Sequence, residues 1–563
     1  MYKWIKKPPI TILLVSIAVM MPQILGHQLI LGGVTTVQGD ALFHFNRIYD
    51  AMMQLKTLHF HYFVSDFGFN QSARVINAVY GPFSSYIYGA VLLVTGSWWL
   101  FQIISSIGIL YLGGLTFFYL ARQVELDRGL ALVGSLIYLN TEAITSWATA
   151  QKGAALAASI LPLVILAAVK MIQQKEHALP IWLLAIGLSL LVQIHNLTAI
   201  MAVMMLIPFW LLGLIRQQQR WLYIRHTLLA ALIFMVLTAN VWATLLDLTW
   251  HNVLMKPVKF VLASYTTMPS ILSHWLGIPI LILVMWQLYQ LIFRWRLLSL
   301  TNRVVALVGL FFVFLSSALM PWQLIQDNLP ILGSLLQFPA RFMIIATPLI
   351  LLGSLQTVQT DLQVPRHWRQ TGSIVVLVLL FVGNLQTVTS ETQQWSTNFA
   401  TASSVQKHGT MQQIRQAWLS PQLAAGLQRL TKDTSDYLPK MGKTADAYHL
   451  VNHSIYTGTT TFHKRVTRQG LQVDWNAPQA TPIQVPVVKY QQTHLKLNGQ
   501  TIQPLHQNAV GVITVQSHQG LNQLLVTYQP ARWVSISLVV AMVSWIIVGV
   551  EIIGRKCEHH QPR

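Results

Sequence analysis

Apolar runs long enough to cross a lipid bilayer recur along this chain, and they limit its possible folds more than any other feature. A membrane-spanning helix needs about 20 mostly apolar residues, and such runs extend from near the first residues to 532–553. Of the 563 residues, 53% are hydrophobic and only 10% are charged, which excludes an ordinary soluble enzyme. We therefore expect an all-α polytopic membrane bundle.

The basic residues indicate how these runs are threaded. The net charge is +20, and Lys and Arg sit mostly in short clusters between apolar runs, as expected for cytoplasmic loops. No nucleic-acid-binding motif accompanies them, so we expect no nucleic-acid partner. The pattern predicts about 12 transmembrane helices with both termini in the cytoplasm. The expected crossings are 10–31, one within 83–121, 129–149, 154–172, 178–195, 197–215, 227–246, 272–293, 304–320, 342–357, 371–388 and 532–553.

Two of these runs need comment. The first follows Lys3, Lys6 and Lys7 but is long enough to span and has no clear cleavage site, so we expect a retained helix rather than a signal peptide. The run 83–121 has nearly twice the length of one span. A single crossing preceded by a juxtamembrane or re-entrant helix, and two full crossings, are both open.

The composition divides the chain into three parts. Residues 1–388 are expected to form the transmembrane domain, with an external loop at 32–80. Residues 389–530 are richer in Gln, Thr, Asn and Ser and predict a small extracytoplasmic β-rich domain, sandwich-like in form. Its expected strands are 483–490, 494–497, 510–515 and 524–528, with Pro486 restricting the first to a sheet edge. Residues 531–563 are expected to be the final transmembrane helix and a cytoplasmic tail.

The segment after the first span carries the strongest candidate for chemistry. Gly39-Asp40 predicts a turn and helix N-cap. Asp40, His44 and Arg47 then fall at i, i+4 and i+7, on one face of the helix. A carboxylate, an imidazole and a guanidinium at a lipid–water boundary suit a phosphorylated, lipid-linked substrate. The other interpretation is an interfacial amphipathic helix whose polar face is solvated and has no catalytic role.

Other polar residues near the expected external surface are weaker candidates for substrate binding. Arg47, Arg74 and Arg341 are candidates to hold a phosphate, because a guanidinium grips it with two parallel hydrogen bonds; interfacial arginines also commonly reach towards lipid headgroups. His195 and Asn196 lie near an expected external helix end, where solvation would also explain them. Asp436-Tyr437 and the external lysines are expected to form a solvated domain surface.

Metal and cofactor motifs are sparse. His59, His61 and Asp66 form a weak candidate for a divalent metal site, because two histidines lack a defined third ligand. The single cysteine, Cys557, excludes an intrachain disulfide and a Cys-based metal site. The chain has no Walker A loop, no GxSxG and no HExxH motif. The sequence therefore assigns no cofactor and leaves a divalent metal as an open alternative.

The chain resembles the GT-C superfamily of membrane glycosyltransferases. The residues that carry this resemblance are Gly39-Asp40 after one N-terminal span, with His44 and Arg47 following, and the helix–basic loop–helix stretch from Phe118 to Leu132. Within that group it is similar to bacterial membrane proteins labelled as related to 6-pyruvoyl-tetrahydropterin synthase. That similarity rests on Gln337 to Phe342, Gly153 to Pro162, His195-Asn196 and Asp436 to Pro439. More distantly, it resembles membrane proteins that glycosylate lipoteichoic acid. The pterin chemistry of the label is not carried over, because the soluble fold and a nearby catalytic cysteine are absent.

The resemblance implies a function at a bacterial cell membrane. The donor would be a polyprenyl-phosphate sugar, and the acceptor a hydroxyl on an extracytoplasmic glycan, polymer or protein. By the resemblance, Asp40 would remove the acceptor proton. The other roles are our own placements: Arg341 or Arg74 would stabilise the departing phosphate, and His44 and Arg47 would orient substrate or the carboxylate. A lipid-linked glycan transporter or flippase, and a non-catalytic cell-envelope assembly protein, are the alternatives.

Overall fold

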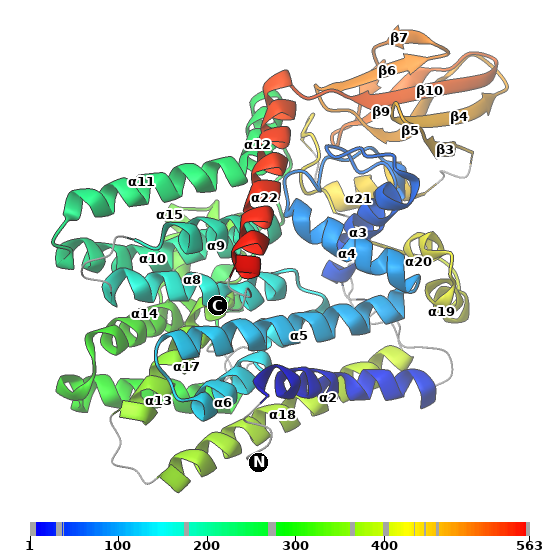
Figure 1. Ribbon diagram of the computed structural model, residues 1–563. Helices are drawn as coiled ribbons and strands as arrows, with labels where there is room; N and C mark the ends of the chain where they lie inside the picture. Colours follow the sequence, from blue (N-terminus) through cyan, green and yellow to red (C-terminus); the bar gives the residue numbers. More distant parts are fainter. Residues whose placement is uncertain are drawn as a thin grey trace.

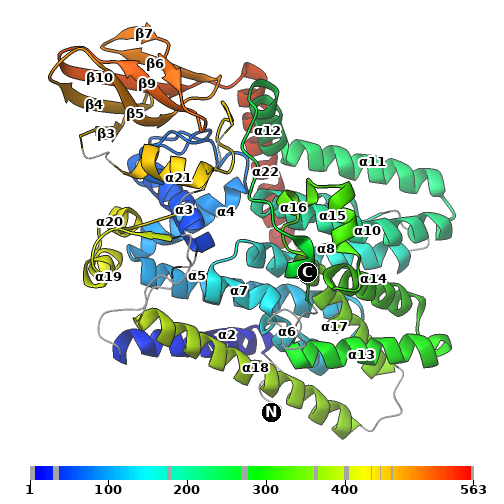
Figure 2. The same ribbon diagram turned by 180° about the vertical axis from the view of Figure 1, so that it is seen from behind.

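The computed structural model shows a large helical part and a smaller region of β-strands (Figure 1). The structure describes residues 7–29, 37, 39–173, 179–267, 277–360, 366–397, 405–432, 434–443, 446–457 and 461–558. Seen from behind, the β-strands still stand clear of the main body of helices, with α3, α4 and α21 beneath them (Figure 2).

Helices account for most of the chain. The first half contains α2 (Pro8–Leu29), α3 (Gly39–Thr57), η1 (Phe69–Gln71), α4 (Pro82–Thr95), α5 (Trp98–Gln123), α6 (Arg128–Leu139), α7 (Glu142–Ala150), α8 (Ala154–Gln173), α9 (Ile181–Ile194), α10 (Asn196–Arg216), α11 (Arg220–Leu237), α12 (Ala239–His251) and η2 (Leu262–Tyr265). The second half contains α13 (Gly277–Phe293), η3 (Trp295–Leu297), α14 (Leu300–Ser316), α15 (Trp322–Asn328), α16 (Leu332–Leu335), η4 (Pro339–Phe342), α17 (Met343–Thr360), α18 (Arg366–Thr397), α19 (Met411–Leu419), α20 (Leu423–Arg429), α21 (Ala447–Val451), η5 (Asn452–Tyr456) and α22 (Arg532–Glu558).

Seven of the described helices are long and apolar enough to cross a membrane, which indicates a multi-pass membrane protein. They are Pro8–Leu25, Trp98–Gln123, Ala154–Gln173, Asn196–Arg216, Arg220–Leu237, Pro339–Gln359 and Arg532–Ile552. Five further apolar helices are shorter: Pro82–Thr95, Ile181–Ile194, Gly277–Phe293, Leu300–Ser316 and Ile374–Ser390. The expected count of about 12 crossings is therefore not established by helix length.

Several expected spans differ from the observed helices. Residues 129–149 form two helices, α6 and α7: the backbone leaves the helical conformation at Asn140, the C-cap of α6, and α7 begins after Thr141. Residues 227–246 are likewise divided, between α11 and α12 at Thr238. The long run 83–121 is divided at Gly96 into α4 and α5, of which only α5 has span length. Helix α18 continues to Thr397, across the domain boundary expected at residue 389.

The helical core is built around α5, α8 and α17. Helix α5 packs on α6 and α8, α8 packs on α9 and α10, and α17 packs on α13 and α14. Helices α8 and α17 are largely buried, whereas α11 and α22 expose most of their apolar side chains. In a membrane protein, such exposed apolar faces are suited to contact lipid.

The β-rich region confirms the expected strands. Five strands form one sheet in the order β3-β4-β10-β6-β7, and three form another in the order β5-β9-β8. The strands are β3 (His463–Val466), β4 (Leu471–Ala477), β5 (Pro482–Val488), β6 (Thr493–Leu497), β7 (Gln500–Ile502), β8 (His506–Gln507), β9 (Val512–Gln516) and β10 (Gly520–Tyr528). All described pairings are antiparallel. Strand β5, which contains Pro486, lies at a sheet edge, as a residue without a backbone N–H requires.

Segments expected on the external side meet in space. The loop before α4 joins the β-rich region, because the N–H of Val488 donates to the carbonyl of Ser72 at 2.8 Å. Leu254, which follows α12, forms a β-bridge with Pro439. A two-stranded sheet of β1 (Val405–Lys407) and β2 (Leu430–Lys432) packs on α3 through β2. The start of α3 is thus placed against the C-terminal part of the chain.

Close packing of α3 on α4 makes a testable prediction. A Cβ added at Gly89 would lie 2.8 Å from the backbone nitrogen of Met52 and 3.1 Å from the Cβ of Ala51. Gly89→Ala should therefore push the two helices apart and cost about 1–3 kcal/mol of stability, which thermal denaturation in detergent would measure. Gly108→Ala is the matched control, because nothing lies within 4 Å of that added Cβ. Equal melting temperatures for the two variants would contradict this packing.

Candidate functional site

The carboxylate of Asp40 lies where α3 meets the C-terminal region. Helix α3 begins at Gly39, so Asp40 lies in its first turn instead of forming the expected N-cap. The Asp40 side chain is 60% exposed, and the Nζ of Lys432 lies 2.7 Å from its Oδ1. Lys432 is the last residue of β2 and lies 392 positions further along the chain. The folded chain therefore pairs the candidate acid with a distant cation.

The charges around Asp40 keep it ionised. Desolvation by the surrounding protein works to raise the pKa of this carboxyl, but the charge and hydrogen bond of Lys432 oppose it. The charges of His44 and Arg341 act in the same direction as Lys432, and the pKa of Asp40 is lowered overall. At neutral pH this group is a carboxylate and can accept a proton.

Arg341 supplies a second cation to this neighbourhood. It lies in the 3₁₀ turn η4, where its Nη1 donates to the carbonyl of Leu336 at 2.9 Å. Its guanidinium carbon lies 4.7 Å from the centre of the Phe338 ring, within the range of a cation–π contact. These contacts direct the half-buried guanidinium so that its charge acts on Asp40. The Gln337 to Phe342 motif therefore serves to position Arg341.

His195 belongs to the same neighbourhood. It caps α10, with its Nδ1 2.8 Å from the Oγ1 of Thr198. Burial lowers the pKa of His195 to about 3, and the charges of Arg341 and Arg47 add to this effect. The imidazole is therefore neutral at physiological pH. Its ring centre lies 6.0 Å from that of Tyr80.

His44 is also a buried, neutral imidazole. Burial lowers its pKa to about 3, with Arg47 as the next contribution. A Cβ added at Gly153 would lie 3.0 Å from the Cε1 of His44, so the chain packs tightly over the ring at this position. A neutral His44 can donate or accept a hydrogen bond to substrate but cannot bind phosphate as a cation.

Arg47 is occupied by partners within the protein. It is 2% exposed. Its Nε donates to the Oδ1 of Asn77 at 3.1 Å, its Nη2 donates to the carbonyls of Tyr80 and Gly81, and its Nη1 lies 3.2 Å from the Nδ1 of His44. The contacts of Arg47 thus attach the Tyr80-Gly81 turn to α3 and leave little of the guanidinium for a phosphate.

Asp50, one turn beyond Arg47, also attaches the loop after α3 to the helix. Its Oδ1 accepts the backbone N–H groups of Phe67 and Gly68, at 2.8 and 3.2 Å. Its Oδ2 accepts from the side-chain amides of Gln54 and Asn77, at 2.8 and 3.3 Å. Desolvation raises the pKa of this fully buried carboxyl to about 7 despite these donors. Asp50 was not singled out in the sequence, although an acidic residue inside an amphipathic helix was a signal available there.

Arg74 and Asn196 have structural partners of their own. Arg74 is fully buried, with its Nη1 3.4 Å from the Oγ1 of Thr434 and its Nη2 donating to the carbonyl of Asp436 at 3.0 Å. The side-chain amide of Asn196 donates to the carbonyl of Val79 at 3.1 Å. These contacts hold segments of the chain around the site, so Arg74 is a less suitable phosphate ligand than Arg341.

The C-terminal side of the site differs from the expected solvated surface. Lys432 is paired with Asp40, and burial raises the pKa of Asp436, although Arg74 and Lys432 oppose that rise. Tyr437 adopts a φ of 64°, a conformation uncommon for a large side chain, and its ring centre lies 6.4 Å from that of Tyr80. The only sequence signal for this side was the Asp436 to Pro439 motif.

The expected metal site is incomplete. His61 and Asp66 form a pair, with Nδ1 to Oδ2 at 2.6 Å, whereas the backbone N–H of His59 donates to the Oγ1 of Thr57. Among the residues that the structure describes, no group of three or more His, Cys, Asp or Glu side chains is placed to hold a metal ion. The residues present therefore do not fit a divalent metal at this position.

The raised pKa of Asp50 predicts a pH-dependent stability. The folded pKa of about 7 exceeds the ordinary value of 3.8. Its contribution to stability is therefore fully present below about pH 4 and is lost as the pH rises through about 7. Asp50→Asn cannot titrate at this position. The difference in melting temperature, wild type minus Asp50→Asn, should therefore become smaller as the pH rises from about 4 to above 7. Thermal denaturation across the range measures it.

The matched control is the exposed Asp327, whose carboxylate accepts a hydrogen bond from the side-chain amide of Gln323 at 2.9 Å. Asp327→Asn removes the same kind of side chain at the surface, so its melting temperatures should not reproduce the trend expected for Asp50→Asn. A difference for Asp50→Asn that does not change with pH would show that Asp50 is not the titrating group.

Comparison with known proteins adds distant likenesses. No protein-family model matches this chain, and no curated protein matches it in sequence. Among solved structures, the arabinofuranosyltransferase AftD from Mycobacteria is 14% identical with a TM-score of 0.42, over 70% of this chain and 27% of AftD. The apo oligosaccharyltransferase of Archaeoglobus fulgidus is 10% identical with a TM-score of 0.39, over 69% of this chain and 56% of that protein. This chain thus spans well under two thirds of either protein, and neither likeness assigns it an activity.

Proposed function

We propose that this protein is a membrane glycosyltransferase that moves a sugar from a polyprenyl-phosphate donor to a hydroxyl of an extracytoplasmic glycan, polymer or protein. The observation that carries this proposal is the accessible carboxylate of Asp40, ionised and flanked by the cations Lys432 and Arg341. A base beside two cations, on a bundle of apolar helices, suits attack by a hydroxyl on a sugar whose leaving group is a lipid phosphate.

The proposed step balances as follows. The acceptor oxygen attacks the anomeric carbon while Asp40 takes the hydroxyl proton. The bond between that carbon and the phosphate oxygen breaks, and its electron pair leaves with the polyprenyl phosphate. Lys432 and Arg341 stabilise the negative charge that develops on the departing phosphate. Neutral His44 and His195 are placed to orient hydroxyl groups by hydrogen bonding.

Because Lys432 is paired with Asp40, we expect the donor phosphate to bind before Asp40 takes the acceptor proton. In the substrate-free protein, Lys432 donates a hydrogen bond to the base and lowers its affinity for a proton. A donor phosphate competes for Lys432 and releases Asp40 towards the acceptor. Arg341 has its own support from Leu336 and Phe338 and serves as the fixed cation. The described residues at this site offer cations in place of a set of metal ligands, and the proposed step uses them.

Asp40→Asn tests the base directly. The variant keeps the shape of the side chain but removes its proton-accepting charge, so transfer should fall by about 10²–10⁴-fold. The measurement is sugar transfer in membranes supplied with polyprenyl-phosphate sugars, together with the cell-envelope glycan composition. Asp327→Asn, an exposed change of the same chemistry, should leave both readouts unchanged. Full activity of Asp40→Asn would reject the proposed chemistry and favour the transporter or assembly alternatives.

Lys432→Met tests whether Lys432 changes its partner from Asp40 to the donor phosphate. Loss of the cation should raise the KM for the donor and reduce kcat/KM by about 10–100-fold, equivalent to about 1.4–2.8 kcal/mol. The pKa of Asp40 should rise without Lys432, so the acidic limb of the pH–rate profile should move to higher pH. Lys432→Arg should restore much of the donor affinity. Lys443→Met, at an exposed lysine, is the control. If the acidic limb of the pH–rate profile does not move in Lys432→Met, the pairing of Lys432 with Asp40 is contradicted.

A further inference from the structure

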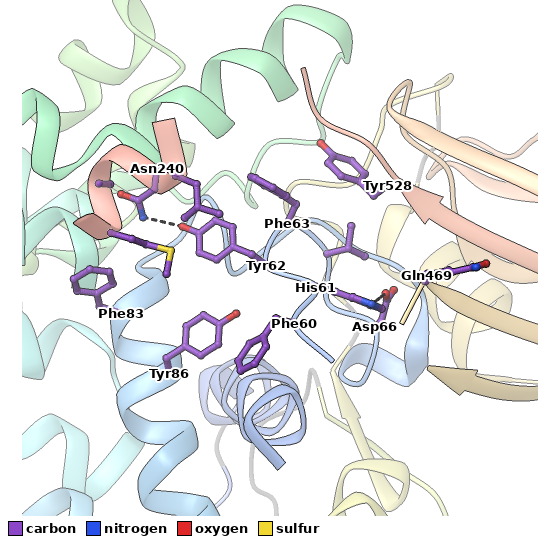
Figure 3. A pocket seen from close by; sticks show the side chains of 15 residues that line it. Phe60, His61, Tyr62, Phe63, Asp66, Phe83, Tyr86, Asn240, Gln469 and Tyr528 are labelled. Atoms are coloured by element: carbon purple, nitrogen blue, oxygen red, sulfur yellow. Dashed lines mark hydrogen bonds and ion pairs between the residues drawn. The ribbon is translucent and has the colours of Figure 1, made fainter. Parts of the chain in front are cut away.

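A cavity of about 610 Å³ lies at the other end of α3 from Asp40 (Figure 3). The two ends are separated by about 26 Å of helix, at 1.5 Å per residue. Its walls come from the loop after α3, from α4, α12 and α22, and from the ends of strands in the β-rich region. Six aromatic side chains line it: Phe60, Tyr62, Phe63, Phe83, Tyr86 and Tyr528. The cavity is therefore separate from the candidate glycosyltransferase site.

One side of the cavity is continuous with an apolar helix surface. Leu538, Ala541 and Met542 line it from α22, at i, i+3 and i+4 on one helix face. This helix is one of the seven with the length and composition of a membrane span. Phe60 and Met542 are 55% and 54% exposed and mark the mouth of the cavity. The mouth thus opens beside a surface suited to contact lipid.

Most polar groups in the cavity wall are already paired. The side-chain amide of Asn240 donates to the hydroxyl of Tyr62 at 2.8 Å, and the hydroxyl of Tyr86 donates to the Oε1 of Gln54 at 2.8 Å. His61 and Asp66 bind one another. A sugar would need partners for several hydroxyl groups, whereas a hydrocarbon chain needs none. The wall therefore favours a hydrocarbon ligand over a glycan.

Among the described residues of the wall, two polar groups are left for a ligand, the Nε2 of His61 and the hydroxyl of Tyr528. The hydroxyl of Tyr528 is buried and has no hydrogen-bond partner within the described part of the chain. Figure 3 shows Tyr528 at the side of the cavity nearest the β-rich region, with Phe83 and Tyr86 across from it. A buried hydroxyl without a partner is costly, and a single polar group of a ligand would remove that cost.

We propose that this cavity binds the hydrocarbon chain of a membrane lipid, with one polar group of the lipid hydrogen bonded to Tyr528. The volume is in the range of ligand sites, about 300–1,000 Å³, and the mouth beside α22 provides entry from the bilayer. The ligand class follows from the aromatic and aliphatic wall and from the small number of buried polar atoms left without a partner in the described wall, the Tyr528 hydroxyl and the His61 Nε2. This site is independent of the proposed sugar transfer.

Photolabelling of the full chain tests this site. The protein is reconstituted in vesicles of phosphatidylglycerol that carries a diazirine on one acyl chain, irradiated, and mapped by peptide mass spectrometry. Adducts are expected in residues 60–64, 83–86 and 538–542. Ala541→Trp fills the wall and Met542→Trp blocks the mouth, so each should reduce these adducts at least about tenfold. Val540→Trp, at an exposed position on the other side of α22, should leave them unchanged.

The outcomes separate the possibilities. Unchanged labelling in Met542→Trp, whose exposed side chain can be enlarged without disturbing the core, would overturn the proposal even if Ala541→Trp failed to fold. Adducts confined to the outward face of α22 would show annular lipid only and would also overturn it. Loss of the adducts on addition of a soluble oligosaccharide would instead identify a glycan site. Asp40→Asn should label like the wild type, so failure of the transferase proposal leaves this test intact.

Discussion

Two buried ionisable side chains on α3 hold the parts of the site in place. Arg47 and Asp50 are 2% and 0% exposed, and a charge removed from water is tolerated only when hydrogen bonds replace its hydration. Arg47 finds those bonds in the Tyr80-Gly81 turn, and Asp50 finds them at Phe67 and Gly68. The loop between α3 and α4 is thereby fixed to α3 at two points, and Asn77 joins them by bonding to both charged side chains.

The ion pair at the start of α3 has a different character. Asp40 is 60% exposed and Lys432 only 17%, so solvent screens their attraction. Such pairs contribute about 0–1 kcal/mol to stability. The pair is therefore poorly suited to hold the fold together and well suited to exchange partners. A weak pair allows Lys432 to leave Asp40 when the donor phosphate binds. The buried side chains of Arg47 and Asp50 keep the rest of the site rigid.

Helix α3 links two different environments. At its first turn it presents a carboxylate among cations, and beyond its last turn the chain enters a cavity lined by aromatic side chains. A row of hydrogen bonds runs between them, from Tyr86 through Gln54 and Asp50 to Asn77 and Arg47. Each bond in this row is buried or partly buried, so the row holds this part of α3 against α4 and the loop that precedes it.

The sequence by itself determined the features that depend on neighbouring residues. Its apolar runs indicated a membrane protein, its segment rich in β-branched residues indicated the strand that contains Pro486, and the i, i+4, i+7 spacing placed Asp40, His44 and Arg47 on one helix. Only the tertiary structure decided which charged side chains remain accessible to a substrate. Arg47 and Arg74 became buried supports, the run 129–149 broke at Asn140, and Lys432 met Asp40 across 392 positions. The physical reason is that periodicity is a local property, whereas the pairing of charges depends on which distant segments pack together.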